Sequence, residues 1–112
     1  MQKDKEKVSL EQIQLMEQTI QNLSLQKQVF HLELLETNNA MQELEKLEGD
    51  EVYRIVGAVM FKADKEELKK ELKKKIELLE LRIKSIEKQE QELREKLLKE
   101  RSSMLKSKLE KK

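Results

Sequence analysis

The sequence predicts a mainly α-helical protein: a long antiparallel two-helix coiled coil with one β-hairpin joining the helices. Charged residues make up 42% of the 112 residues and apolar residues 37%, and the chain has two Gly and no Pro. This composition is typical of long, exposed helices and unlike that of a compact globule of this size. Two heptad patterns, separated by one short segment rich in β-branched residues, predict the two helices and the hairpin within a single domain, residues 1–112.

The first helix is predicted from about residue 9 to residue 48. Ser9 and Gln12 have the spacing of a capping box, which favours a start at Ser9. Gly49 favours a stop, because glycine adopts the left-handed conformation that commonly follows a helix. Apolar residues recur at steps of three and four, the spacing of a coiled-coil seam. The seam positions are Ile13, Met16, Ile20, Leu23, Lys27, Phe30, Leu34, Thr37, Met41 and Leu44.

The segment from residue 52 to 63 is predicted to be a β-hairpin. Gly57 stands at the first position of a two-residue loop, which fits a type II′ turn. That turn predicts the pairs Val56–Val59, Ile55–Met60 and Arg54–Phe61. An isolated hairpin is marginal in water, so we expect the helices to cover one face and another chain to cover the other. The candidate assembly residues are Val52, Tyr53, Ile55, Val56, Gly57, Val59, Met60 and Phe61.

The second helix is predicted from about residue 65 to residue 110. Asp64, with Glu67 three residues later, is a candidate N-cap with its capping-box partner. Glu residues four positions before Lys support the exposed faces of this helix. The second seam consists of Leu72, Ile76, Leu79, Ile83, Ile86, Leu93, Leu97 and Met104, and it is interrupted by Glu90 and Glu100.

The two seams match when the chain folds back on itself. Facing residues of antiparallel helices have a constant sum of residue numbers, and the seams give 113, as for Leu34 with Leu79. The same rule places Lys27 and Glu90 in neighbouring layers, where a diagonal ion pair is expected to set the register. Residues 1–56 carry 6 basic and 11 acidic residues, whereas residues 57–112 carry 18 and 12, so an acidic arm faces a basic one.

The composition argues against several functional classes. The chain has one His, His31, no Cys and no glycine-rich loop, so we expect no catalytic residue, no metal site and no cofactor. A net charge of +1 creates no field that draws in nucleic acid or an anionic membrane. The longest apolar stretch, residues 55–61, is far too short to span a bilayer. A cysteine-free chain also suits the cytoplasm, which is the expected location.

Apolar residues outside the seams are candidates for contact with other proteins. In the middle of the arms they are Leu25, Val29, Leu32, Leu35, Leu78 and Leu81. They favour contact with a neighbouring subunit or a client protein, although scattered surface apolar residues are ordinary. The lysines between residues 69 and 75 are interleaved with glutamates, which favours a solvated or inter-chain face over phosphate binding.

The two chain termini form the far end of the coiled coil, where the seam becomes imperfect because Ile13 faces Glu100. Apolar residues gather beside this weak zipper, and methionines add adaptable side chains. They form a candidate client-binding tip, while an ordinary ragged coiled-coil end remains the alternative. The candidate residues are Val8, Leu10, Leu15, Met16, Leu98, Met104, Leu105 and Leu109.

With these features the sequence resembles the β-type subunits of the prefoldin family. The resemblance is carried by residues 52–57, Val-Tyr-Arg-Ile-Val-Gly, by residues 88–92, Lys-Gln-Glu-Gln-Glu, and by the two long heptad helices. About fifteen residues between Glu48 and Asp64 leave room for one hairpin, whereas the α type carries two. The short carboxyl terminus, rich in Ser and Lys, departs from the family pattern, so the resemblance does not assign the client contacts.

The resemblance implies an ATP-independent chaperone of two α-type and four β-type subunits. The hairpins would form a double β-barrel base, which makes residues 52–63 assembly residues. The tips of the coils would hold unfolded client proteins and pass them to a group II chaperonin. A structural or adaptor coiled coil without client binding is the alternative, and an RNA-gripping helical arm is a more distant one. The apolar hairpin and the near-neutral charge disfavour both.

Overall fold

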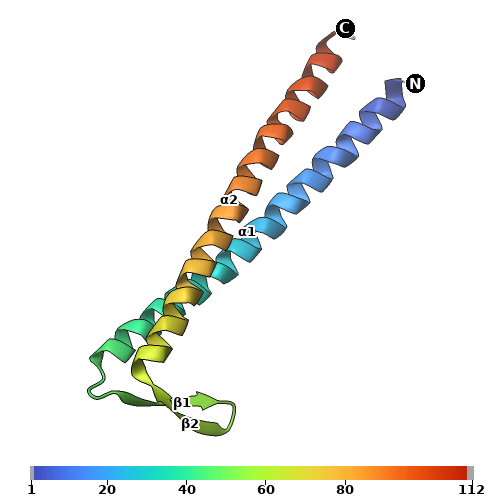
Figure 1. The fold of residues 1–112 in the computed structure, drawn as a ribbon. Helices are drawn as coiled ribbons and strands as arrows, with labels where there is room; N and C mark the ends of the chain where they lie inside the picture. Colours follow the sequence, from blue (N-terminus) through green and yellow to red (C-terminus); the bar gives the residue numbers. More distant parts are fainter. Residues whose placement is uncertain (1, 111–112) are drawn as a thin grey trace. The chain divides into compact units, whose positions relative to one another are not determined.

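A computed structural model describes the backbone of residues 2–110 and the side chains of residues 10–109. Along the chain the elements are α1 (Gln2–Lys46), β1 (Glu51–Val56), β2 (Val59–Asp64) and α2 (Lys65–Glu110) (Figure 1). The predicted fold class is confirmed, since two long helices are joined by a single antiparallel hairpin. Among the described residues, no helix has a stretch both long and apolar enough to cross a membrane.

The ends of α1 differ from the predicted ends. The helix begins at Gln2 instead of near residue 9, because residues 2–8 contain no Pro or Gly that would stop it. Ser9 therefore lies inside the helix and does not cap it. The helix ends at Lys46, where the Leu47 amide donates to the Leu44 carbonyl at 3.2 Å and tightens the last turn. Gly49 then adopts a left-handed φ of 93°.

The hairpin has the predicted register. Val56 pairs with Val59, Ile55 with Met60 and Arg54 with Phe61. Gly57 has a φ of 61°, and no non-glycine residue in the described part of the chain has a positive φ. A type I′ turn requires a positive φ at both central residues, so Ala58 excludes it. The predicted type II′ turn agrees with these angles. At the open end, the Lys65 amide donates to the Asp50 carbonyl at 2.8 Å, and α2 follows β2 directly.

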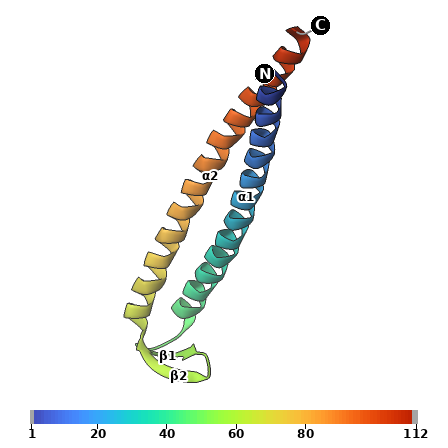
Figure 2. The same cartoon turned by 90° about the vertical axis from the view of Figure 1, so that its right-hand side faces the viewer.

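The chain divides into two compact units, each containing a segment of both helices. The terminal unit comprises residues 1–28 with 84–112, and the hairpin unit comprises residues 29–83. Within each unit the segments of α1 and α2 run antiparallel and side by side (Figures 1 and 2). In the hairpin unit the hairpin lies at the ends of the two helix segments. There the Lys65 ammonium donates a hydrogen bond to the Leu47 carbonyl, and its positive charge complements the negative end of the α1 dipole.

Both predicted seams are confirmed by burial. Every predicted seam position of α1 is buried or half-buried, and so is every one of α2. The buried apolar residues of the seams are Ile13, Leu23, Leu44, Leu79, Ile83, Ile86 and Leu97. Thr37 is also buried, and its hydroxyl donates to the Glu33 carbonyl at 2.7 Å, which satisfies the polar group inside the seam.

Contacts between the helices allow the predicted register to be compared with the structure in each unit. In the hairpin unit, the Arg82 guanidinium lies 5.6 Å from the centre of the Phe30 ring, close to the predicted Phe30–Ile83 layer. In the terminal unit, Arg101 binds Glu17, a pair within about one and a half helical turns of the register. The hairpin unit thus pairs close to the predicted sum of 113, whereas the terminal-unit pair sums to 118.

Candidate functional site

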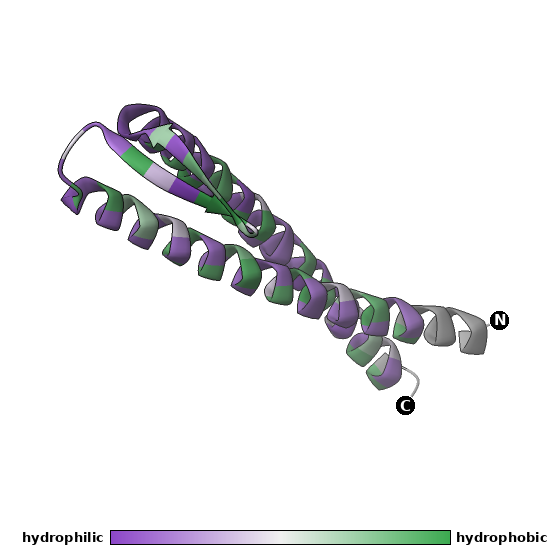
Figure 3. Ribbon diagram, turned by 90° about the horizontal axis from the view of Figure 1, so that it is seen from below, coloured by the Kyte–Doolittle hydropathy of each residue, from purple (hydrophilic) through white to green (hydrophobic). Residues whose placement is uncertain are grey.

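The hairpin exposes apolar side chains on both of its faces. Side chains alternate between the faces of a strand, and residues paired across the strands lie on the same face. We call one face the helix-side face, formed by Val52, Arg54, Val56, Val59, Phe61 and Ala63, and the other the outer face, formed by Tyr53, Ile55, Met60 and Lys62. Figure 3 shows hydrophobic residues interspersed with hydrophilic ones in both strands. Neither face is therefore purely a solvent surface.

The helix-side face is covered only at its base. Val52 is 5% exposed, whereas Val56 and Phe61 are 55% and 52% exposed. An open groove of about 420 Å³ separates this face from the first turns of α2, and the Arg54 guanidinium lies 3.0 Å from the Glu71 carboxylate at its edge. The expectation that the helices cover one face is wrong for most of the hairpin. The hairpin continues past the helix ends, and the charged Glu71 binds Arg54 instead of packing against the apolar residues.

The outer face is fully open within the described chain. Tyr53, Ile55 and Met60 are 62%, 69% and 62% exposed, and Lys62 and Glu51 form an ion pair of 3.6 Å across the strands. The two strands pair only with each other, so each leaves one edge without strand partners. A two-stranded hairpin with two open apolar faces is marginal alone, and exposed apolar surface of this kind marks protein interfaces.

The structure separates the candidate tip residues into two groups. Five leucines in the terminal unit are between 48% and 66% exposed: Leu10, Leu15, Leu98, Leu105 and Leu109. Met16 and Met104 are half-buried, because they occupy seam positions. Val8 lies outside the residues whose side chains are described. The leucines form the accessible part of the candidate tip, and the methionines contribute to the zipper beneath it.

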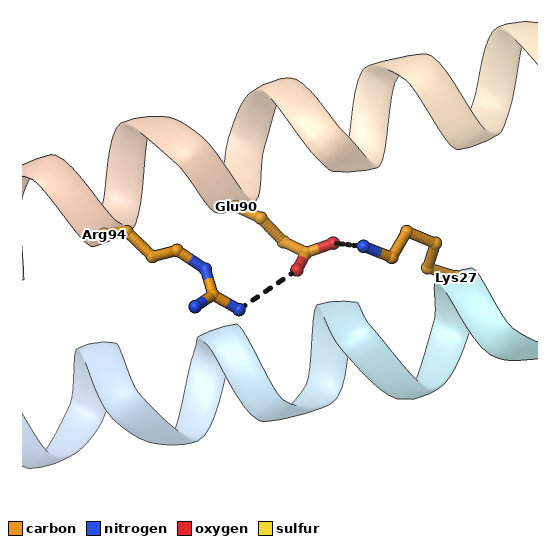
Figure 4. A network of polar contacts seen from close by, with 3 residues as sticks. All are labelled: Lys27, Glu90 and Arg94. Atoms are coloured by element: carbon orange, nitrogen blue, oxygen red, sulfur yellow. Dashed lines mark ion pairs between the residues drawn. The ribbon is translucent and has the colours of Figure 1, made fainter.

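A buried charge cluster lies in the seam of the terminal unit (Figure 4). Glu90 is only 4% exposed; Lys27 Nζ lies 2.9 Å from its Oε1 and Arg94 lies 3.5 Å from its Oε2. The Lys27 contact is an ion pair without hydrogen-bond alignment, since Oε1 has no hydrogen-bond partner. The predicted diagonal pair is confirmed. Sequence reasoning missed Arg94, although its spacing of four residues from Glu90 was a usable signal.

The metal-ligating side chains of the described residues do not gather into a cluster. No three His, Cys, Asp or Glu side chains among them gather in a way that could hold a metal ion. His31 is exposed on α1. The charge cluster around Glu90 lies at a seam position, where paired charges are expected to set the register of a coiled coil.

These features define a class of protein: a two-helix coiled coil that carries an exposed, apolar β-hairpin between its arms. The sequence profile of the family described as "Prefoldin subunit" matches residues 7–112. Prefoldin subunit beta of Thermococcus onnurineus is 43% identical over 89 residues, which cover 79% of this chain and 77% of that protein. Its counterpart from Sulfurisphaera tokodaii is 42% identical over 89 residues, 79% of this chain and 71% of that one. The chain therefore belongs to the prefoldin subunit family.

Solved structures agree with this assignment and point to the β type. The crystal structure of the prefoldin beta subunit from Thermococcus strain KS-1 has a TM-score of 0.83 and 36% identity, and the match covers 92% of this chain and 91% of that one. The beta2 subunit from the same strain, at 19% identity and a TM-score of 0.66 over 79% of this chain and 95% of that one, shares the fold. The predicted resemblance to prefoldin β subunits is confirmed, and the chain is a chaperone subunit and not an enzyme.

Proposed function

We propose that this β-type subunit assembles with α-type subunits into a hexamer of two α and four β chains, which acts as an ATP-independent holdase. In this proposal the ends of the coils capture unfolded protein and deliver it to a group II chaperonin. The observation that carries the proposal is the exposed hairpin. Its six apolar residues Tyr53, Ile55, Val56, Val59, Met60 and Phe61 are between 52% and 69% exposed.

The hairpin supports assembly because its two faces and its strand edges lack partners that other chains can supply. Its helix-side face is open above Val52, its outer face is open throughout, and each strand has an unpaired edge. Hairpins from several chains can extend the sheet edge to edge and close it into a barrel, which removes the edges and buries the faces together. The six residues would become the interior and the seams of the shared base, with Val52 linking the base to the helices.

The exposed leucines of the terminal unit support client capture. Leu10, Leu15, Leu98, Leu105 and Leu109 are separated by charged and polar residues, so each patch is small and its affinity for an unfolded chain is low. Several coils on one base multiply such weak contacts through effective concentration. Release then needs no energy source, which is consistent with a sequence that contains only two Gly and no phosphate-binding loop.

The proposal also concerns the partner that receives the client and the compartment. A chaperonin that contacts the ends of the coils would meet mixed charges there, because Lys99 and Arg101 lie close to Glu95 and Glu100 on α2. Such contacts are weak and salt-dependent, as a transient handover requires. The cysteine-free sequence suits a reducing cytoplasm, where an intracellular chaperonin is available.

The proposal is tested by mixing the chain with an α-type prefoldin subunit and measuring the native mass of the product. A hexamer of two α and four β chains is expected, together with suppression of aggregation of a denatured test protein without nucleotide. The double variant Val56→Lys, Val59→Lys should keep its helicity but form no hexamer. The matched control is Lys62→Gln, which also lies in β2 but replaces a residue that is already charged. It puts no new charge on an apolar position and should assemble normally. A normal hexamer from the double variant contradicts the barrel, and a hexamer without suppression favours the adaptor function.

A further inference from the structure

The hairpin unit carries two exposed stripes that the hairpin interface does not use. On α1, Leu32 and Leu35 are 58% and 57% exposed, and on α2, Leu78 and Leu81 are 48% and 65% exposed. All four lie on the side of their helix that faces away from the seam. We call the exposed residues Leu32, Leu35, Glu43 and Lys46 the α1 edge, and the exposed residues Glu67, Lys70, Leu78 and Leu81 the α2 edge.

The two edges of one chain point in opposite directions, because α1 and α2 turn their seams toward each other. The α1 edge of one copy can therefore meet the α2 edge of another copy, and never its own. The levels of the two edges within the unit are set by contacts between the helices. Arg82 lies over the Phe30 ring, and the Lys65 ammonium binds the Leu47 carbonyl, so residues whose numbers sum to about 113 lie at the same level.

The edges are complementary, level by level, when two copies stand side by side with their hairpins at the same end. Nearest the hairpin, Lys46 is level with Glu67 and Glu43 is level with Lys70, so both matches join opposite charges. Farther along, the levels join leucine to leucine: Leu35 with Leu78 and Leu32 with Leu81. Glu43 and Lys46 pair with each other at 3.4 Å within α1, but their side chains are 74% and 73% exposed, so each can still meet a charge of another copy.

One level of this arrangement opposes the others. Glu36 is level with Glu77, which places like charges near each other. Lys74 lies one turn nearer the hairpin and between the levels of Glu36 and Glu43, where it offsets that repulsion. Two opposite-charge levels and two leucine levels thus outweigh a single like-charge level, and charge complementarity across the edges selects the orientation of the second copy.

We propose that the α1 edge is a docking surface for the α2 edge of a second copy of this chain, in the same orientation. The contact is heterologous, so each copy keeps one free edge and neighbouring coils can line up in a row. Apolar contact between the leucines supplies attraction, and the flanking charges fix the register. The contact is separate from the hairpin association proposed above, and its failure leaves that proposal standing.

The test uses single-cysteine variants of the full chain, which has no cysteine of its own. Leu32→Cys and Leu81→Cys chains are mixed at high concentration under oxidising conditions, and the disulfide-linked dimers are identified by mass. Such a dimer joins two different chains by design. The matched control mixes Leu81→Cys with His31→Cys, an exposed neighbour of Leu32 on a different side of α1. We expect the Leu32–Leu81 dimer to form several-fold faster than the control dimer.

Charge swapping provides the second measurement. Glu43→Lys in the Leu32→Cys chain should slow dimer formation, and Lys70→Glu in the Leu81→Cys chain should slow it as well. Combining both changes restores opposite charges across the contact and should restore the rate. These substitutions lie on exposed positions, so helicity serves as the check that folding is unaffected.

Three outcomes overturn the proposal. The first is an equal rate for the Leu32–Leu81 and His31–Leu81 dimers. The second is a preference for Leu32–Leu32 dimers, which would mean a symmetric contact between α1 edges. The third appears in the mixture with the α-type subunit: protection of Leu32→Cys by that subunit alone would place a different chain on the edge. The native mass of the unmodified chain mixed with the α-type subunit is measured in parallel. This measurement tests the hairpin proposal independently.

Discussion

The seam and the hairpin treat apolar side chains in opposite ways. In the seam, Leu79 is 3% exposed and packs within its own chain, whereas Ile55 in the hairpin is 69% exposed. Both regions have the sequence patterns of their elements, and both form as predicted. The difference shows that the seam stabilises the single chain, while the hairpin has apolar surface that only other chains can cover. Changes in the two regions should therefore affect different properties, with the largest effects on the free energy of unfolding expected in the seam.

The largest effect is expected in the seam. Leu79→Ala should lower the free energy of unfolding by about 2–5 kcal/mol, because it removes buried methyl groups and leaves a cavity. The matched control Leu81→Ala, two residues along α2 and 65% exposed, should change it by less than about 0.5 kcal/mol. Urea unfolding followed by circular dichroism measures both. Equal losses in the two variants would show that the helices do not pair along the predicted seam.

The charge cluster of the terminal unit should have a smaller effect. Lys27→Met removes one cation from Glu90, and because Arg94 remains, we expect a loss of about 1–3 kcal/mol, typical of a weakened buried polar contact. Glu17→Gln, which breaks the exposed pair with Arg101, is the control and should cost less than about 1 kcal/mol.

Replacing the pair as a whole sharpens this comparison. Lys27→Leu with Glu90→Leu should recover the stability or exceed it, because an apolar layer avoids desolvating charges. The same double variant should let the helices slide, which cysteine pairs at Ile20 with Leu93 and at Ile20 with Leu97 detect. Continued selectivity for the first cysteine pair would mean that the charges do not set the register.

The turn of the hairpin should affect assembly more than helix stability. Gly57 has a φ of 61° and open space around the position of a Cβ, so Gly57→Ala introduces backbone strain and no clash. The strain should cost about 1–2 kcal/mol within the hairpin and reduce the yield of hexamer, while the helices melt as before. Ala58→Gly is the control and should assemble normally. Native mass and thermal melting on the same samples distinguish the two properties.

The smallest effect on unfolding is expected at the end of α2. Leu105→Ser with Leu109→Ser should change the free energy of unfolding by less than about 0.5 kcal/mol, because both side chains are already exposed. Suppression of aggregation by the hexamer should nevertheless fall, since multivalent capture amplifies each weak contact. Lys106→Ser with Lys108→Ser, on the same turns, should leave suppression unchanged. If both double variants hold the client equally well, the client site lies elsewhere on the coils.

The periodicity of the sequence determined most of the fold. Heptad spacing identified the seam positions, and the antiparallel sum of 113 placed Lys27 beside Glu90, because helix geometry converts residue spacing directly into faces and levels. Gly57 in a two-residue loop likewise determined the turn and every cross-strand pair. The start of α1 was not predictable in this way, since the capping signal at Ser9 competes with a preceding segment that contains no helix breaker.

Only the tertiary structure decided what the helices cover. The alternation of apolar residues in the hairpin is the same whether a face packs on a helix or stays open, so the sequence could not show that cover ends at Val52. The split of the tip residues was partly visible in the heptad spacing, which placed Met16 and Met104 in the seam, and the structure added that they are half-buried whereas Leu105 is exposed. Burial depends on what stands opposite each residue, and that is a property of packed elements and not of spacing along the chain.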